Sequence, residues 1–335
     1  MPERPGVRWY RHDWNSDLSW RLILTVIPRV PDFLRPPVHF VATLICFVKM
    51  GAERRAARRN LRRVTGRGSP LDLLLSFRLF YNFSKFMVAY TQLAPYCKED
   101  PALRVNNSDE ALRSLREELA RGRGVILLGM HVGQWDLALA ILSGFGFPVT
   151  VVMRREDEES ARYAAATRDA AGLKVAYTGE NPWLSVELRS ALHRNEIVAM
   201  QGDRSYGDRT AWVPLFGAPA EIPVGPWELA RASGASVVPA VLVFEGHRQY
   251  RCVFGEPIRP GEAGSDPEDS RQGMARIAAA LESIIRRYPD QWFNFYDVWP
   301  EESRGVGVEA PPAPGVRSRR KGFLRDRARS TAEGG

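Results

Sequence analysis

Cysteine is scarce in this chain of 335 residues, and several familiar structural classes are excluded on that basis. Only Cys46, Cys97 and Cys252 occur, with no C-x-x-C pair among them. This excludes a disulfide-stapled secreted domain and a cysteine-rich zinc module, and it fits a reducing compartment. Because hydrophobic residues make up 44% of the chain and aromatic residues 10%, wholesale disorder is excluded as well.

The short motifs of several common catalytic sites are also missing. The chain has no G-x-S-x-G, no G-x-x-x-x-G-K-[ST], no H-E-x-x-H, and no G-x-G-x-x-G after an apolar run. Without an activated serine or cysteine, a histidine base has to act on a hydroxyl that the substrate supplies. These absences favour direct transfer onto an acceptor alcohol, with no covalent enzyme intermediate and with no metal or resident cofactor.

Lysine is rare, and arginine carries the positive charge. The chain has 47 Lys and Arg residues against 39 Asp and Glu, a net charge of +8, and only five of the basic residues are lysine. Arginine presents a planar fork that suits phosphates and carboxylates. A basic balance predicts a polyanionic partner, either nucleic acid or an acidic membrane surface, and composition alone does not separate the two.

The N-terminal region is apolar but offers no clean membrane span. It does not resemble a signal peptide, because Asp13 and Asp17 follow the first arginines and no small-residue cleavage site follows. The uncharged run 36–48 would span about 20 Å as a helix, against about 30 Å of hydrocarbon. Four prolines, at positions 28, 31, 36 and 37, favour a broken or re-entrant segment lying in the membrane interface. A buried core helix is the alternative.

A dense group of arginines follows this apolar run. Residues 53–68 carry arginine at positions 54, 55, 58, 59, 62 and 63, which form one basic face on a helix. Ala56, Ala57, Leu61 and Val64 are turned away from that face. Near an acidic leaflet each arginine would contribute about 1 kcal/mol of attraction, so an anionic membrane fits this arrangement better than a nucleic-acid groove. A second apolar stretch, 71–90, predicts a helix that is either deep core or lipid-facing.

From about residue 100 apolar strands alternate with helices. Strands are predicted at 124–130, 148–153, 173–177, 196–201, 236–244 and 250–254. Helices are predicted at 109–121, 135–142, 156–171, 183–194, 226–232 and 266–288, with a Pro/Gly-rich loop region at 202–223. The pattern indicates an α/β fold with a mostly parallel sheet flanked by helices. We expect an N-terminal helical membrane-associating region at 1–98, the α/β domain at 99–300 and a disordered basic tail at 301–335.

One short stretch carries residues suited to catalysis. The strand 124–130 leads directly into His131, and ligands of open parallel sheets sit beyond the carboxyl ends of the strands. Asp136 follows in the first turn of the next helix, and Gly133 permits the bend between them. An acid bonded to one ring nitrogen fixes the tautomer and raises the basicity of the other. The alternative is a structural histidine, with Asp136 merely favourable to the helix dipole.

The turn His131-x4-Asp136 after an apolar strand resembles the motif of the glycerolipid acyltransferase superfamily. Further blocks are similar to its bacterial lipid A biosynthesis branch, the lauroyl/myristoyl type. These are A-R-R-N-L at 57–61, the strand-end Arg154, D-R-S-Y-G at 203–207, and W-V-P-L-F-G-A-P-A at 212–220 with matching residues on to 239. The resemblance covers residues 50–300 and implies a glycerol-3-phosphate acyltransferase-like fold.

The resemblance also implies an activity and a place in the cell. It implies a membrane-associated O-acyltransferase that moves a fatty acyl chain from acyl carrier protein or coenzyme A thioester to a hydroxyl of a glycolipid of the lipid A precursor type. Its location would be the cytoplasmic face of the bacterial inner membrane, peripheral or single-pass. Its partners would be an anionic membrane surface, the thioester donor and the glycolipid acceptor, and no nucleic acid.

The same resemblance implies a role for each candidate site residue. His131 takes the proton of the acceptor hydroxyl, and Asp136 orients its imidazole. Arg154 binds an acceptor phosphate or steadies the developing oxyanion. Asp203, Tyr206 and Gly207 complete the substrate pocket. Phe216 lines the acyl groove.

Two departures from the family pattern leave the acceptor open. Asp136 stands where the branch often has glutamate, and Ser205 replaces the second acid of its D-x-D-Y-G block. Both fit a relative that acts on another glycolipid, a lysophospholipid or another lipid. A non-catalytic membrane-surface binder, in which the His131 and Asp136 pair is structural, is the alternative from a different functional class.

Overall fold

A seven-stranded sheet forms the centre of the molecule in the computed structural model, which describes residues 30–90, 104–154, 168, 173–205, 209–261 and 267–299. The strand order is β1-β9-β8-β2-β5-β3-β4. Only β8 and β9 pair antiparallel, and all other neighbours are parallel, as predicted. The strands are β1 (Arg104–Asn106), β2 (Val125–Gly129), β3 (Val149–Arg154), β4 (Lys174–Thr178), β5 (Ile197–Gln201), β8 (Ser236–Gly246) and β9 (Gln249–Phe254).

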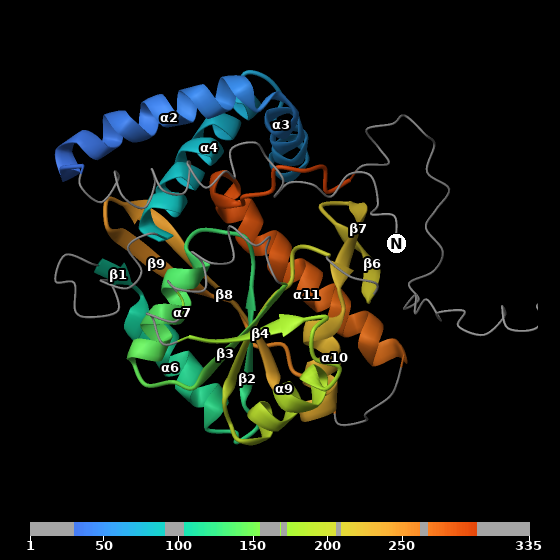
Figure 1. Cartoon of the computed structure of the whole chain (residues 1–335). Helices are drawn as coiled ribbons and strands as arrows, with labels where there is room; N and C mark the ends of the chain where they lie inside the picture. Colours follow the sequence, from blue (N-terminus) through green and yellow to red (C-terminus); the bar gives the residue numbers. More distant parts are fainter. Residues whose placement is uncertain are drawn as a thin grey trace, which may run out of the picture.

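Strand β2 lies near the middle of the sheet, which explains its unbroken apolar sequence. Val125 and Leu127 point into a core cluster with helices α6 (Ser108–Leu119) and α7 (Trp135–Gly144). Ile126 and Leu128 point to the opposite face, where α9 (Leu184–His193), α10 (Gly225–Ser233) and α11 (Pro267–Arg287) pack. Successive side chains of a strand face opposite sides, so a strand covered by helices on both faces is apolar throughout. Figure 1 shows the two groups of helices on either side of the sheet.

The predicted strands and helices of this body match the structure closely, but the short strand β1 and a hairpin were not predicted, and one predicted helix stays untested. The predicted helix at 156–171 lies outside the described residues apart from Arg168. The region 202–223, predicted as a loop, instead contains the antiparallel hairpin of β6 (Thr210–Leu215) and β7 (Ala218–Pro223).

The position of the hairpin explains why a strand sequence can be as rich in proline as a loop. Its two strands form a separate sheet, so both are edge strands, where proline is tolerated. Pro214 and Pro219 face each other in its register. The turn residues Phe216 and Gly217 have φ of 50° and 74°, the left-handed pair that a tight hairpin turn requires. The prolines therefore mark an edge and not a loop.

In the part of the chain that the structure describes, four helical elements precede the sheet: η2 (Asp32–Leu34), α2 (Arg35–Lys49), α3 (Gly51–Thr65) and α4 (Leu71–Tyr90). Of the four prolines that predict a broken segment, Pro36 and Pro37 do not interrupt α2, which is continuous, and position 28 lies outside the described residues. Pro36 and Pro37 occupy the first turn of α2, where the missing N–H would have no intrahelical partner anyway. Within the described residues, none of the helices has both the length and the apolar character needed to cross a bilayer.

The helices α3 and α4 pack directly on the α/β body. One core cluster joins Leu61 of α3 and Phe80 of α4 to Leu242 of β8 and to Phe293 and Phe295 near the C-terminal end of the described chain. The predicted boundary at residue 98 lies outside the described residues, and so does the predicted tail 301–335.

The predicted basic face of α3 is partly neutralised inside the molecule. Arg58 and Arg62 both pair with Asp72 of α4, whose side chain is fully buried, with Arg58 Nε 3.2 Å from Asp72 Oδ2. Arg59 pairs with Asp297. The prediction that Ala56, Ala57, Leu61 and Val64 turn away from the basic face is confirmed, since all four are buried. These arginines therefore join α3 to its neighbours.

The Asp72 pair predicts a measurable loss of stability. We expect Asp72→Asn to lower the free energy of unfolding by about 1–3 kcal/mol, the range for leaving one partner of a buried hydrogen bond unsatisfied. Urea unfolding of the variant tests this, with Glu117→Gln as the control because Glu117 is an exposed acid on α6. Equal stability of the two variants would contradict the assigned role.

Candidate active site

His131 lies immediately beyond the carboxyl end of β2, as the sequence predicted. The neighbouring parallel strand β5 ends at Gln201, which pairs in register with Gly129 of β2. Asp203, two residues after β5, is thereby placed beside His131 at the same edge of the sheet. Gly202 between them has no room for a side chain, because a Cβ there would lie 2.5 Å from Leu128 Cδ1. The close approach of the two strand ends brings the histidine and the acid together.

The imidazole of His131 is held by the carboxylate of Asp203. His131 Nδ1 lies 2.8 Å from Asp203 Oδ1, and the His131 backbone N–H donates to Asp203 Oδ2 at 3.1 Å. Trp292 Nε1 donates to the same Oδ2 at 2.9 Å. An ionised carboxylate only accepts hydrogen bonds, so the ring proton sits on Nδ1 and the lone pair is on Nε2.

The charges of this pair follow from its burial. Burial lowers the pKa of His131 to about 4, and the nearby Arg204 acts in the same direction, while Asp203 and Asp136 oppose the shift. Burial alone would raise the pKa of Asp203. The attraction and hydrogen bond of His131, with Arg204 and the Trp292 bond, outweigh burial and lower it. At neutral pH the site therefore holds a neutral imidazole beside an ionised carboxylate.

Asp136, predicted to orient His131, makes a different contact. It is buried in the first turn of α7, and its Oδ1 accepts a hydrogen bond from Arg168 Nε at 3.1 Å. Among the described residues its Oδ2 has no hydrogen-bond partner. The acid bonded to the ring is thus Asp203, which the sequence had assigned to substrate binding. The charge of Asp136 also raises the pKa of His131.

The remaining predicted site residues lie further from His131 or outside the described chain. Arg154 is exposed at the carboxyl end of β3, at the same edge of the sheet. Phe216 is buried in the turn of the β6–β7 hairpin, with its ring centroid 6.2 Å from that of Trp299. Tyr206 and Gly207 lie outside the described residues. The structure brings His131, Asp203 and Asp136 together and does not place Phe216 against the histidine.

An aromatic wall surrounds the histidine ring, and sequence reasoning missed it. The ring centroid of Trp135 lies 5.3 Å from that of His131, and the ring of Phe86 from α4 packs against that of Trp135, with centroids 4.3 Å apart. Phe293 joins the same group at 5.7 Å from Phe86. These rings contribute to the burial of the imidazole and leave little polar surface beside it. Aromatic residues from three distant segments gave no sequence signal of this contact.

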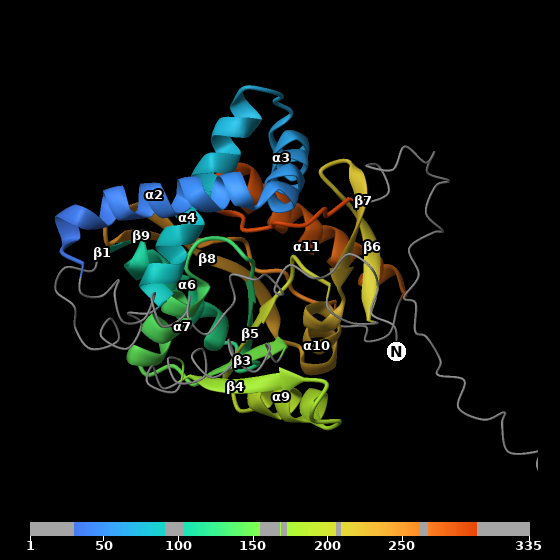
Figure 2. The same ribbon diagram turned by 45° about the horizontal axis from the view of Figure 1, so that its top comes forward.

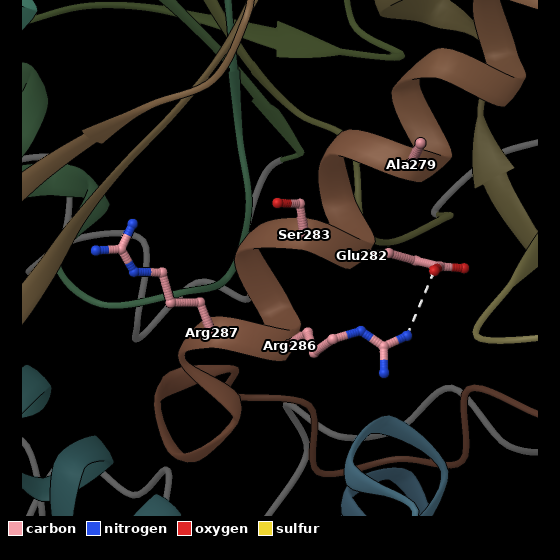
Figure 3. A pocket seen from close by; sticks show the side chains of 5 residues that line it. All are labelled: Ala279, Glu282, Ser283, Arg286 and Arg287. Atoms are coloured by element: carbon pink, nitrogen blue, oxygen red, sulfur yellow. Dashed lines mark ion pairs between the residues drawn. The ribbon is translucent and has the colours of Figure 1, made fainter.

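A shallow cavity of about 490 Å³ lies elsewhere, along α11. Figure 3 shows that its Arg286 and Arg287 side chains point away from each other. Arg286 Nη2 lies 3.7 Å from Glu282 Oε2, which offsets its charge. None of the lining residues is among the hydrogen-bond partners of His131 or Asp203 given above, so we assign this cavity no part in the candidate site.

Comparison with known proteins decides the family. The family model described as bacterial lipid A biosynthesis acyltransferase matches residues 12–300. The chain belongs to this family. The resemblance of the sequence blocks is thereby confirmed, and the His131 turn, Asp203 and the 292–299 segment all lie within the matched range.

Similar curated proteins share parts of the chain. A phosphatidylinositol mannoside acyltransferase of Mycobacterium tuberculosis H37Rv is 33% identical over 138 residues, 40% of this chain and 43% of that protein. Its counterpart in Mycolicibacterium smegmatis is 28% identical over 184 residues, 54% of this chain and 58% of that protein. A lipid A biosynthesis lauroyltransferase of Escherichia coli K12 is 25% identical over 198 residues, 58% and 62% of the two chains. The matched parts thus span about half the length of these relatives.

The burial of His131 predicts an unusual titration. We expect the imidazole to remain neutral down to about pH 5 and to titrate near 4, well below the value of about 6.5 for an exposed histidine. The unfolded chain then binds the extra proton between these values, so this histidine makes stability fall as the pH drops from about 6.5 to 4.

NMR titration of the histidine ring protons measures this value, with assignment by the His131→Ala variant. Asp203→Asn should lower the midpoint further, because it removes a charge that favours the imidazolium. A midpoint near 6.5 in the folded protein would be inconsistent with the buried site.

Proposed function

We propose that the protein is an O-acyltransferase that moves a fatty acyl chain from an acyl thioester to a hydroxyl of a glycolipid. The observation that carries this proposal is the neutral imidazole of His131, whose Nδ1 proton is bonded to Asp203 and whose ring lies beside that of Trp135. A base of this kind is what a reaction on a substrate hydroxyl requires. Family membership supports the same reaction class.

In the proposed reaction Nε2 of His131 takes the proton of the acceptor hydroxyl as its oxygen attacks the thioester carbonyl. The carbon–oxygen bond forms, the carbon–sulfur bond breaks, and the imidazolium returns the proton to the leaving thiolate. Asp203 stabilises the imidazolium that exists between these steps, and general-base help of this kind contributes about 10²–10⁴ in rate. The thioester, acyl carrier protein or coenzyme A, is a co-substrate, and no resident cofactor takes part.

We propose that Arg154 binds the acceptor lipid and does not contact the thioester carbonyl. It lies at the carboxyl end of β3, separated from β2 by β5, and its side chain is exposed. A guanidinium there can bind a phosphate of the acceptor in bidentate fashion. Tyr206 and Gly207 remain predicted parts of the same pocket.

The names of the relatives support a class of acceptor but not one particular acceptor. The relatives at 33% and 28% identity are named for phosphatidylinositol mannoside and the one at 25% for lipid A. Both names denote lipids with a sugar headgroup, so we propose a sugar hydroxyl as the acceptor. Lipid mass spectrometry of the host with and without this chain identifies the acyl length and the acceptor together.

Substitution of the base tests the reaction directly. We expect His131→Ala to lower kcat by about 10²–10⁴, because the variant loses the general base. Transfer is measured with acyl carrier protein and coenzyme A thioesters, on both a lipid A precursor and a phosphatidylinositol mannoside. Glu117→Gln is the control. Full transfer by a folded His131→Ala variant on either acceptor would refute the proposed role.

We propose further that α2 rests on an anionic bilayer. The uncharged polar side chains of α2 face the protein, and its outward face is apolar. His39 and Thr43 contact Ser84 of α4, and Cys46 packs on the same core cluster. The outward face of η2 and α2 consists of exposed hydrophobic residues: Phe33, Leu34, Val38, Phe40, Val41, Leu44, Ile45 and Val48. Figures 1 and 2 show α2 along the edge of the molecule, away from the sheet.

The length and charges of α2 favour a position in the plane of the membrane interface. A helix of 15 residues is about 22 Å long, too short to cross about 30 Å of hydrocarbon. Its only charged residues are Arg35 and Lys49, one at each end. Apolar contact along the helix with cations at both ends suits an anionic bilayer surface.

Vesicle flotation tests this surface and separates binding from catalysis. We expect Val41→Glu with Leu44→Glu to weaken binding to anionic vesicles at least tenfold, because burial of each side chain contributes about 1.5–3 kcal/mol. Val186→Glu is the matched control, since Val186 is equally exposed on α9. Unchanged flotation of the α2 variant would contradict the proposed surface. Binding without transfer to any acceptor would instead favour a non-catalytic membrane binder.

A further inference from the structure

The segment 292–299, here called the covering segment, closes over the candidate site. The backbone N–H of Phe293 donates to the carbonyl of His131 at 2.8 Å, and Trp292 forms a bridge with Val132. Trp292 also donates to Asp203, as described above. Trp292 and Phe293 are both buried. The covering segment therefore contributes one donor to the orienting acid and part of the wall that keeps water from the base.

One asparagine of α3 holds this segment. Asn60 Nδ2 donates to the carbonyls of Tyr296 at 2.8 Å and Asn294 at 3.3 Å, and Asn60 Oδ1 accepts from the Val298 N–H at 3.3 Å. The side chain is buried, at 2% exposure. An amide carries both donors and an acceptor, so asparagine serves carbonyls and an N–H of the same segment at once.

Neighbouring arginines on the same face of α3 add to this contact. Arg59 Nε and Nη2 lie 2.7 and 2.5 Å from the two carboxylate oxygens of Asp297, a bidentate pair. The guanidinium of Arg63 lies over the Trp299 ring at 5.2 Å from its centroid. Positions 59, 60 and 63 share one side of a helix. The A-R-R-N-L block at 57–61 thus contacts the covering segment directly.

Arg204 attaches the covering segment from the other side. Its Nε donates to Asn294 Oδ1 at 2.6 Å, and its Nη2 donates to the carbonyl of Phe293. Arg204 follows Asp203 in sequence, so these two consecutive residues shortly after β5 both bind the same segment. The segment is therefore held between α3 and the strand end that carries the orienting acid. In Figure 1 the end of α11, which leads into this segment, lies beside α3.

We propose that Asn60, assisted by Arg59, is a positioning residue for the active site, holding the covering segment against His131 and Asp203. This inference rests on the proposed function for its catalytic consequence. It gives the A-R-R-N-L block a purpose that neither the transfer chemistry nor the membrane surface accounts for.

Release of the covering segment should change the site in a specific direction. Loss of the Trp292 bond frees the Asp203 carboxylate, and water gains access to the imidazole. Burial is the main cause of the low pKa of His131, so that pKa should rise towards its ordinary value. The Asp203 carboxylate would then orient the ring less firmly, which lowers kcat more than it weakens substrate binding.

The test compares Asn60→Ala with a destabilised variant that does not touch the covering segment. Glu118→Gln serves as that variant, because buried Glu118 bonds Ser236 and Arg259 at the opposite ends of the strands. For Asn60→Ala we expect the NMR midpoint of His131 to rise by about one pH unit or more. We also expect kcat to fall roughly tenfold, with less than about threefold change in KM. Glu118→Gln should lower stability and leave the His131 midpoint in place.

The outcomes separate this proposal from a structural role and from the proposed function. If Asn60→Ala loses stability as Glu118→Gln does, with the His131 midpoint and kcat unchanged, Asn60 is structural and the proposal is overturned. If Asn60→Ala does not fold, Arg59→Gln replaces it, since Arg59 is half-exposed and its loss is milder; the same shift in midpoint is expected, and its absence overturns the proposal. If the midpoint shifts while the unaltered protein transfers no acyl group, the positioning role stands and the proposed function fails.

Discussion

The hydrogen bond between His131 Nδ1 and Asp203 is the interaction on which the rest of the site depends. It sets the tautomer of the ring, with the proton on Nδ1 and the lone pair on Nε2, and in the proposed reaction it stabilises the imidazolium. Its geometry follows from the sheet, because β2 and β5 are adjacent and parallel and both end at the same edge. Gly202 leaves space for Leu128 of β2, which a larger residue would contact too closely. Trp292 Nε1 donates a hydrogen bond to Asp203 Oδ2.

Burial of this pair is costly, and the surrounding structure offsets that cost. A carboxylate removed from water loses several kcal/mol of solvation unless donors replace the water. Asp203 receives three donors, two from His131 and one from Trp292. The same burial keeps the imidazole neutral at physiological pH, so its ring can accept a proton. The burial that excludes water from His131 and the hydrogen bonds that fix Asp203 thus come from the same contacts. The covering segment and α3 complete these contacts. Since α3 follows directly on α2, the helix with the exposed apolar face is joined to the helix that holds the site together.

Much of the fold could be predicted from local sequence patterns, and what could not depends on contacts between distant segments. The unbroken apolar run of β2 and the position of His131 after it were sufficient to predict the sheet and the candidate base. The acid was misassigned, because sequence spacing points to Asp136 while strand order places Asp203 against the ring. The hairpin at 210–223 was missed because its prolines lie on strands with free edges. The contact of Asn60 with the covering segment joins positions more than 230 residues apart, which no local pattern reveals.

The central claim is that His131 is a neutral, buried base whose Nδ1 proton is held by Asp203. The most direct measurement is the pair of ¹⁵N chemical shifts of the His131 ring at neutral pH, assigned with His131→Ala and compared with Asp203→Asn. The account predicts the neutral tautomer protonated at Nδ1, and loss of that tautomer preference in the Asp203 variant. A charged imidazolium, a ring protonated at Nε2, or a ring that does not respond to Asp203→Asn would contradict it.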